Sequence, residues 1–434
     1  MTGGRESAKE PANSRKWEHG GSLVLLLLII GSAVAAFVFW PKPLPPAPAL
    51  NTLAASAEKG AYLAKIGNCA ACHTTTGKAP YAGGHMFETP FGKLFSTNIT
   101  SDEKHGIGAW NFAQFHRAMK HGQRANGDHL YPAFPYTSFA RMSDEDIGSL
   151  YLFLTNVDAV PEPNRENALD FPFNNRFLLY FWKRLFLDSD SYITDPEKSV
   201  AWNRGNYLVE GVAHCGACHT PRNFVGAAKS GQALQGGTYV DKVASGEHKL
   251  WAAPDITPGP HGLAAWDEKD IINYLTTGKN GHAVVHGPMN GVFASTASLS
   301  RDDATAIARY LHQKSPGARR IDWPSLGGRA AKGEIIYTVH CGTCHLPDGK
   351  GDKILGVPLT RNALVQAADP ASLINVILYG PDLPPPPFDS KRTVMKPFGK
   401  RLSDEDIASL ATYLRGSFGN IASAVSPDQV RKQR

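Results

Sequence analysis

The motif Cys-x-x-Cys-His occurs three times in this chain and uses every cysteine that the chain contains. The copies are GNCAACHT at residues 67–74, HCGACHT at 214–220 and HCGTCHL at 340–346, and the sequence has six cysteines in all. A cysteine pair at this spacing is typical of a redox disulfide, of half a zinc site or of a covalent cofactor attachment site. The repetition therefore predicts three equivalent sites of one kind.

The histidine that directly follows the second cysteine separates these alternatives. A thioredoxin-like disulfide needs no histidine there, and zinc motifs more often separate their cysteine and histidine ligands by a longer loop. Covalent attachment of haem uses all three residues, because the two thiols add to the vinyl groups and the imidazole binds the iron. We therefore expect three covalently bound haem c groups. The predicted attachment residues are Cys69, Cys72, Cys215, Cys218, Cys341 and Cys344, and the predicted proximal iron ligands are His73, His219 and His345.

Each motif belongs to a longer repeat that ends in a similar segment. MSDEDIGSLYLFL (142–154), LSRDDATAIARYL (299–311) and LSDEDIASLATYL (402–414) align without gaps. Each has a serine as the expected helix N-cap, an aspartate three positions later and apolar residues at helical spacing. A first helix that carries the motif and an amphipathic closing helix would pack on each other around a haem. Since no strand-like alternation runs for any length, we predict an all-α fold with three cytochrome c-like haem domains.

The sixth ligand of each iron is expected in the loop before the closing helix. Met289 in HGPMNG and Met395 in VMKPFGKRL have this position, and a methionine thioether on the distal side raises the haem potential. The first repeat has Phe134 where a methionine would align, and phenylalanine cannot bind iron. The alternatives there are Met142, His129 or a five-coordinate iron, and we take Met142 as the working assignment.

An apolar segment near the N-terminus stands apart from the repeats. SLVLLLLIIGSAVAAFVFW (22–40) has 19 residues without a charge, which at 1.5 Å per residue can just cross a hydrocarbon layer of about 30 Å. Arg15 and Lys16 precede it, as the positive-inside rule expects. The alternative is a signal peptide cleaved after the small residues at 33–35. We favour the transmembrane anchor, and both alternatives export the rest of the chain.

The domain organisation follows from these segments. We expect a cytoplasmic N-terminus (1–21), the anchor or signal peptide (22–40), a proline-rich linker (41–57), cytochrome c domains at 58–160, 201–315 and 325–418, an aromatic linker (161–200) and a flexible tail (419–434). Within the aromatic linker, FPFNNRFLLYFWKRLFLD (171–188) would either face a membrane or a partner protein or pack between haem domains.

Composition excludes some functions. The formal net charge is +6, with 45 basic and 39 acidic residues interspersed, and no basic run indicates binding to nucleic acid. The sequence contains neither a glycine-rich nucleotide-binding loop nor a recognisable catalytic triad. We therefore expect no substrate-oxidising site on this chain, and electron transfer as its role.

Taken together, these features resemble the membrane-bound three-haem cytochrome c subunits of bacterial periplasmic dehydrogenases. The resemblance covers roughly residues 58–415 and rests on the three Cys-x-x-Cys-His motifs, ETPFGKLFSTNIT, GIGAW, LYPAFPY, GPM and the repeated SDEDI. It implies a partner catalytic subunit of the quinoprotein, flavoprotein or molybdenum and iron–sulfur type, oxidising an alcohol, sugar acid, aldehyde or N-heterocycle. Phe134 and the N-terminal anchor are more similar to the molybdenum branch.

The resemblance also implies a place in the respiratory chain. Electrons would leave to ubiquinone or to a further cytochrome or oxidase, with the chain at the bacterial inner membrane and its haem domains on the periplasmic side. Two other roles stay open from the sequence. One is a haem enzyme that uses an open first haem, and the other is a free-standing membrane cytochrome that serves a terminal oxidase.

Overall fold

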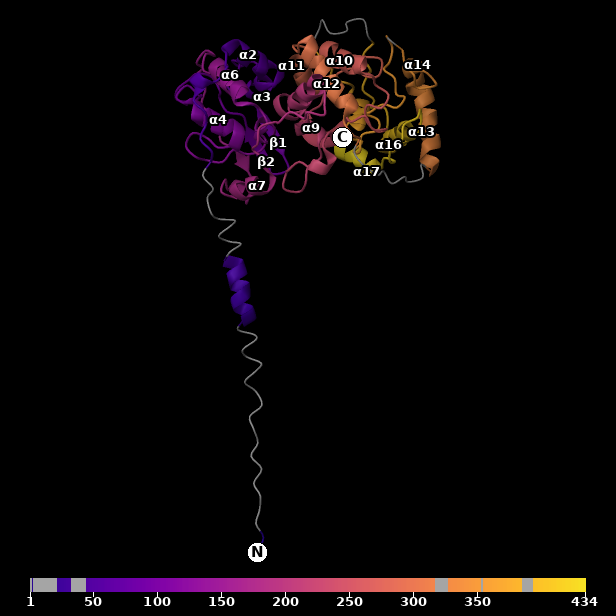
Figure 1. The fold of residues 1–434 in the computed structure, drawn as a ribbon. Helices are drawn as coiled ribbons and strands as arrows, with labels where there is room; N and C mark the ends of the chain where they lie inside the picture. The colour runs from indigo at the N-terminus through magenta and orange to yellow at the C-terminus, as the bar shows by residue number, and fades with distance from the viewer. Residues whose placement is uncertain (1, 3–21, 33–43, 317–326, 353, 385–392) are drawn as a thin grey trace.

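The computed structural model describes residue 2 and residues 22–32, 44–316, 327–352, 354–384 and 393–434. The repeats follow one another across the folded body, with α2 (Ala57–Ile66) near one end and α13 (Gly327–His340) at the other (Figure 1). Each repeat begins with a helix that leads into a short helix at the Cys-x-x-Cys-His motif, and ends with the predicted closing helix.

The helices of the three repeats correspond to one another in order. The first repeat contains α2, α3 (Cys69–His73), α4 (Phe112–His121), α5 (Tyr136–Phe139) and α6 (Asp144–Leu154). The second contains α8 (Val200–Asn206), η2 (Tyr207–Val212), α9 (Gly216–His219), α10 (Glu268–Thr277), α11 (Met289–Thr296) and α12 (Arg301–Gln313). The third contains α13, α14 (Gly342–His345), α15 (Ala371–Tyr379) and α16 (Asp404–Gly416). Outside this common series, the folded body also contains η1 (Leu50–Thr52), α7 (Leu178–Phe186), η3 (Ser230–Gln232) and α17 (Pro427–Gln433).

A glycine in the first helix of each repeat allows that helix to lie directly against the closing helix. A Cβ atom on Gly60 would overlap the carbonyl oxygen of Ser149, and Gly205 and Gly333 are in the same situation against α12 and α16. Any side chain at these positions would force the two backbones apart. The close crossing explains why a glycine recurs eight to ten residues before each motif.

The predicted N-caps of the closing helices are confirmed. The side-chain oxygens of Ser143, Ser300 and Ser403 each accept a hydrogen bond from the backbone amide three residues later. Among these three caps, the aspartate side chain returns the bond to complete a capping box only at Asp406. The carboxylates of Asp146 and Asp303 bind other groups, which are described with the site below.

The predicted all-α fold is wrong, because two antiparallel sheets are present. β1 (Met86–Thr89), β2 (Gly92–Phe95) and β3 (Ala168–Leu169) form one sheet in that order. β4 (Gln235–Lys242) and β5 (His248–Asp255) form the other, with Gln235 opposite Asp255 and Lys242 opposite His248. These strands are short and lie inside loops rich in glycine and proline. Their period-2 signal is therefore too brief to stand out from the surrounding sequence.

The predicted N-terminal transmembrane helix is also corrected. In the part of the chain that the structure describes, no helix is long and apolar enough to cross a membrane. Of the predicted segment 22–40, the structure describes residues 22–32, which are helical. Residues 33–40 lie outside the described residues.

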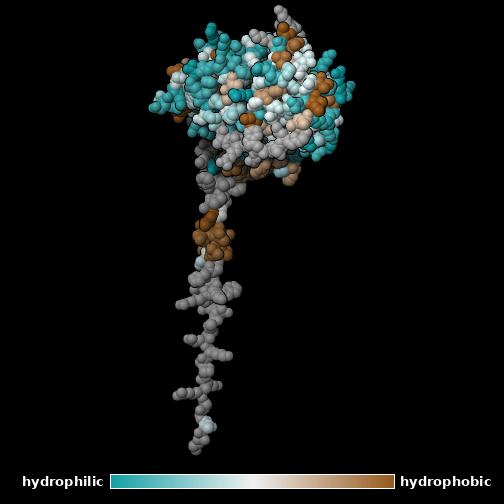
Figure 2. All heavy atoms as spheres, turned by 90° about the vertical axis from the view of Figure 1, so that its right-hand side faces the viewer, coloured by the Kyte–Doolittle hydropathy of each residue, from teal (hydrophilic) through white to brown (hydrophobic). Residues whose placement is uncertain are grey.

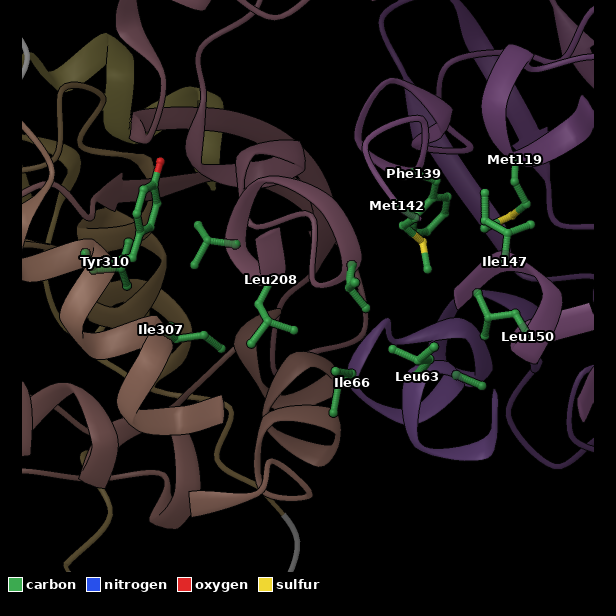
Figure 3. Packing of buried hydrophobic residues seen from close by; sticks show 14 of the residues in the cluster. Leu63, Ile66, Met119, Phe139, Met142, Ile147, Leu150, Leu208, Ile307 and Tyr310 are labelled. Carbon is green, nitrogen blue, oxygen red and sulfur yellow. The ribbon is translucent and has the colours of Figure 1, made fainter. Parts of the chain in front are cut away.

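The apolar core of the first two repeats is continuous. One cluster of buried side chains includes Leu63, Met142 and Leu150 from the first repeat together with Leu208 and Ile307 from the second (Figure 3). The third repeat has a separate cluster of its own, built on α13, α15 and α16. The first two repeats therefore form one packed unit.

The third repeat attaches to this unit through α15. The Ser372 hydroxyl donates to the carbonyl oxygen of Ala252 in β5 at 2.9 Å, and the Asn375 side chain donates to that of Leu250 at 2.8 Å. The expected flexible tail differs in part, because residues 427–433 form α17. Its Val430 is fully buried, since this helix covers an apolar part of the third repeat.

Candidate functional site

The three Cys-x-x-Cys-His motifs line one connected cavity. α3, α9 and α14 carry the motifs, and each follows the first helix of its repeat after a short turn. The cavity has a volume of about 2520 Å³, and its walls are mostly apolar. All six cysteines and the three motif histidines contribute to its lining. The structure therefore brings together every predicted attachment residue and every predicted proximal ligand.

The three motif histidines are held in the same way. Nδ1 of His73 lies 2.6 Å from the carbonyl oxygen of Thr97, Nδ1 of His219 lies 2.8 Å from that of Pro254, and Nδ1 of His345 lies 2.8 Å from that of Val357. A carbonyl oxygen accepts only, so Nδ1 must carry the proton and donate it. The Nε2 atom of each ring then has a free lone pair for a metal, which is the arrangement that metal-binding histidines use.

Burial keeps these imidazoles neutral. It lowers the pKa of His73, His219 and His345, although the hydrogen bond to the carbonyl oxygen works in the opposite direction in each case. A neutral ring is the form that binds iron, because protonation would occupy the second nitrogen. The donor chemistry of the three sites therefore fits the proximal side of a haem.

The cysteines fit covalent attachment better than the two alternatives. All six are free thiols. Burial raises the pKa of Cys69 and Cys215 to about 12 and that of Cys72, Cys218 and Cys341 to about 11. Burial thus favours the neutral form of these five thiols, whereas zinc binds the thiolate. Within the described ranges, no three His, Cys, Asp or Glu side chains converge as metal ligands.

Phe134 and Met289 hold equivalent positions in the first two repeats. The amide of Leu130 donates to the carbonyl oxygen of the glycine that ends α4, and the amide of Val285 makes the same 2.8 Å bond to the glycine that ends α10. Four residues later stand Phe134 and Met289, and both line the cavity. The structural register therefore agrees with the sequence alignment, and it places a benzene ring where the second repeat has a thioether.

Met395 also reaches the cavity. It lies in the loop that leads into α16 and packs against the apolar cluster of the third repeat. Its loop is held by the amide of Phe398, which donates to the carbonyl oxygen of Ile377 in α15 at 2.9 Å. Both predicted distal methionines, Met289 and Met395, thus line the same cavity as the motif histidines.

The structure does not bring Met142 to the cavity. Its side chain is fully buried among Phe139, Ile147 and other core residues and does not contribute to the lining (Figure 3). Met119 does line the cavity, but it stands three residues before the glycine that ends its helix. Leucine and isoleucine fill that place in α10 and α15, which indicates a packing role. The ligation of iron by Met142 stays a prediction that its position does not support.

The first two motifs face each other. Nε2 of His214, which precedes the second motif, lies 3.2 Å from the carbonyl oxygen of Gly67, and the Ser295 hydroxyl donates to Asn68 at 2.6 Å. The thiols of Cys72 and Cys218 are close enough for one to affect the other, since the neighbouring sulfur helps to raise the pKa of Cys72. Two of the three sites are therefore adjacent.

Two tyrosines hold these repeats together in a reciprocal way. The Tyr62 hydroxyl donates to Asp303 of α12 at 2.6 Å, and the Tyr207 hydroxyl donates to Asp146 of α6 at 2.5 Å. Each aspartate also binds a cation of its own repeat, Lys59 for Asp146 and Arg204 for Asp303. Sequence reasoning missed this pairing. The signal was available, because Gly-x-Tyr recurs in the first two repeats and is Gly-x-Ile in the third.

Comparison with known proteins agrees with this site. The cytochrome c family profile matches residues 57–158, and the profile of the cbb3-type cytochrome c oxidase subunit III matches residues 328–414. The alcohol dehydrogenase (quinone) cytochrome c subunit of Gluconacetobacter polyoxogenes is 38% identical over 84% of this chain and 81% of its own length. The chain belongs to the dehydrogenase cytochrome c subunits.

Other relatives are similarly close. The fructose dehydrogenase cytochrome subunit of Gluconobacter japonicus is 36% identical over 95% of the chain and 88% of its own length. A component of the nicotinate dehydrogenase of Pseudomonas putida is 38% identical over 94% of the chain, which spans about a third (34%) of that longer protein. As a dehydrogenase cytochrome c subunit, the chain binds haem c and transfers electrons.

Proposed function

We propose that this cytochrome c subunit carries three covalently bound haem c groups and passes electrons from a dehydrogenase to the respiratory chain. The observation that carries the proposal is the identical arrangement of the three motif histidines around one cavity. Haem c, when bound, supplies a one-electron couple at each motif. The residues that would hold the three groups are Cys69, Cys72, Cys215, Cys218, Cys341 and Cys344.

The protein's own groups would set the ligation of each iron. Thr97, Pro254 and Val357 supply the carbonyl oxygens that fix the three motif histidines as neutral donors through Nε2. We propose Met289 and Met395 as the distal ligands of the second and third sites, because both line the cavity. The first site has Phe134 in register with Met289, and we propose that it has no thioether ligand.

A dehydrogenase catalytic subunit would be the electron donor. The names of the relatives support this, since they are components of alcohol, fructose and nicotinate dehydrogenases. We propose a molybdenum-type partner that acts on an aldehyde or N-heterocycle. Support comes from Phe134 and from the name of one relative, which is a subunit of a dehydrogenase of the N-heterocycle nicotinate.

We further propose that ubiquinone or a downstream cytochrome accepts the electrons, and that the haem domains lie on the periplasmic side of the inner membrane. Six cysteines in attachment motifs suit an exported chain, because unmodified thiols would oxidise in that compartment. Protease added to intact spheroplasts is expected to digest the haem domains. Protection until the cells are lysed would contradict this location.

The complex itself provides the test of the function. Purification in mild detergent is expected to yield the haem-bearing chain with a catalytic subunit, whose metal content and cofactor identify its type. Addition of that protein's substrate should then reduce the haem absorbance bands of the cytochrome. A chain that purifies alone, or haem that stays oxidised when substrate is added, would contradict the proposal.

A further inference from the structure

One face of α13 in the third repeat is apolar and exposed. Ile335 and Val339 are spaced one helical turn apart, and each side chain is 66% exposed. Neither contributes to the lining of the cavity or to the apolar core of its repeat. Isolated exposed apolar residues are common, but a pair on one helical face next to a functional site indicates an interaction surface.

The corresponding positions in the first repeat lie in an interface. Counted from the glycine at the helix crossing, Ile335 corresponds to Tyr62, which binds Asp303 of the second repeat. Val339 corresponds to Ile66, which is only 3% exposed and belongs to the core shared by both repeats. The face that is free in the third repeat is thus the face that joins the first two.

The second repeat agrees with this correspondence. Tyr207 occupies the position of Ile335 and binds Asp146 of the first repeat. His214, directly before the second motif, contacts the carbonyl oxygen of Gly67. The third repeat has His340 at that place, and it is exposed. The positions that join the first pair of repeats are therefore open to solvent in the third.

The third repeat leaves this face open because it attaches by another. Its contacts with the second repeat include α15 against β5, as described above, and the carbonyl oxygen of Asp382, which accepts from the amide of Gly287 at 2.6 Å. α13 lies at the edge of the body, away from the first repeat (Figure 1). On the side of the molecule that carries α13, patches of apolar side chains lie beside hydrophilic ones (Figure 2).

Further exposed apolar residues surround the third motif. Leu346 follows the motif directly, Ile354 and Leu355 lie in the loop after it, and Val394 precedes Met395. Leu355 and Val394 also line the cavity. The amide of Thr393 donates to the carbonyl oxygen of Ile354 at 2.9 Å, which holds Val394 near Ile354. Exposed apolar side chains are therefore present both on α13 and at the opening of the third site.

We propose that this surface, defined by Ile335 and Val339 on α13 with Leu346, Ile354 and Val394 beside the third motif, docks the catalytic subunit of the dehydrogenase. The inference rests on the proposed function, which supplies the partner. The first two repeats contact each other through the same face, and this contact brings the first Cys-x-x-Cys-His motif close to the second. A partner on the third repeat would bring its redox centre next to the third motif in the same way.

The apolar character of the face favours a permanent partner. Permanent interfaces are more apolar than those of transient electron carriers, whose contacts are small and polar. The third repeat also has isoleucine where its sister repeats have tyrosine, so its partner needs no carboxylate to accept a hydrogen bond. A stable catalytic subunit with an apolar patch satisfies both conditions.

The test compares the double variant Ile335→Glu with Val339→Glu against a matched control. Val200→Glu is the control, because Val200 is 87% exposed at the start of α8, outside this surface. We expect the double variant to keep its full haem content. The amount of catalytic subunit that co-purifies with it should fall at least tenfold relative to the wild-type chain. The control should retain that partner. Wild-type stoichiometry in the double variant, or an equal loss in the control, would overturn the proposal.

Photo-crosslinking gives a second measurement that does not depend on the double variant folding. A photoreactive amino acid at position 335 of the full-length chain is expected to crosslink to the catalytic subunit, identified by peptide mass, and one at position 200 is not. A crosslink from position 335 only to a second copy of this chain would overturn the inference. The absence of any crosslink from position 335 would also overturn it. Failure of the proposed function is distinguishable, because the wild-type chain would then purify without any catalytic subunit.

Discussion

The hydroxyl of Tyr62 in the first repeat donates a 2.6 Å hydrogen bond to Asp303 in the closing helix of the second. Tyr207 and Asp146 make the reciprocal bond at 2.5 Å. These two bonds cross the interface that brings the first two Cys-x-x-Cys-His motifs together. The same aspartates lie in the first turns of the closing helices, so the start of each helix and the pairing of the repeats depend on the same residues.

Removal of the Tyr62 hydroxyl is expected to weaken this interface. Tyr62→Phe leaves the ring in place but removes a donor to a carboxylate, and such bonds contribute about 1 to 3 kcal/mol. We expect the free energy of unfolding to fall by that amount, measured by chemical denaturation of the haem-loaded chain. Tyr379→Phe is the control, because its hydroxyl binds backbone carbonyl oxygens near the surface. Equal losses in the two variants would contradict a special role for the pairing.

Alanine at Gly60 tests the close helix crossing. In an open helix, glycine to alanine stabilises by about 1 kcal/mol. At Gly60 the new Cβ would overlap the carbonyl oxygen of Ser149, and overpacking of this kind costs about 3 kcal/mol. Gly291→Ala in α11 is the matched control, because no atom lies within 4 Å of its Cβ position. Thermal unfolding should therefore shift in opposite directions for the two variants, and a stabilised Gly60→Ala would contradict the crossing.

Phe134 predicts an open iron at the first site. The dithionite-reduced chain is expected to bind carbon monoxide at one haem per chain, measured by difference spectroscopy. Phe134→Met should abolish this binding, because the register with Met289 places the new thioether at the distal position. Met289→Leu should raise the number of binding haems to two. A wild-type chain that binds no carbon monoxide would contradict the assignment.

Met142 provides the complementary test. Met142→Leu conserves volume, and such core substitutions cost less than about 1.5 kcal/mol. Because Met142 is buried in the core and does not line the cavity, we expect no change in the reduced spectrum or in carbon monoxide binding. Binding by the variant together with none by the wild type would instead show that Met142 is the sixth ligand.

The sequence predicted the parts of this molecule that local patterns encode. The serine N-caps and closing helices were found because a cap and an apolar period lie within one short segment. The motif histidines were found because their spacing is fixed by covalent chemistry. The carbonyl oxygens that orient them are 12 to 35 residues away, and no local pattern marks these partners.

Other features depend on contacts between distant segments. β4 and β5 form a hairpin inside a long loop, where glycine and lysine interrupt the alternation of apolar residues. The tyrosine pairing joins residues 241 and 61 positions apart. The three sequence repeats predicted three domains of similar structure. It did not show that two would pair through one face and that the third would leave that face exposed.

The haem content of the mature chain tests the central claim most directly. Intact mass spectrometry of the purified chain, combined with haem quantitation of the same sample, gives the number of covalently bound groups. The account predicts three haem c groups per chain, falling to two when Cys341 and Cys344 are both replaced by serine. A mature chain that carries no covalent haem, or only two in the wild type, would contradict it.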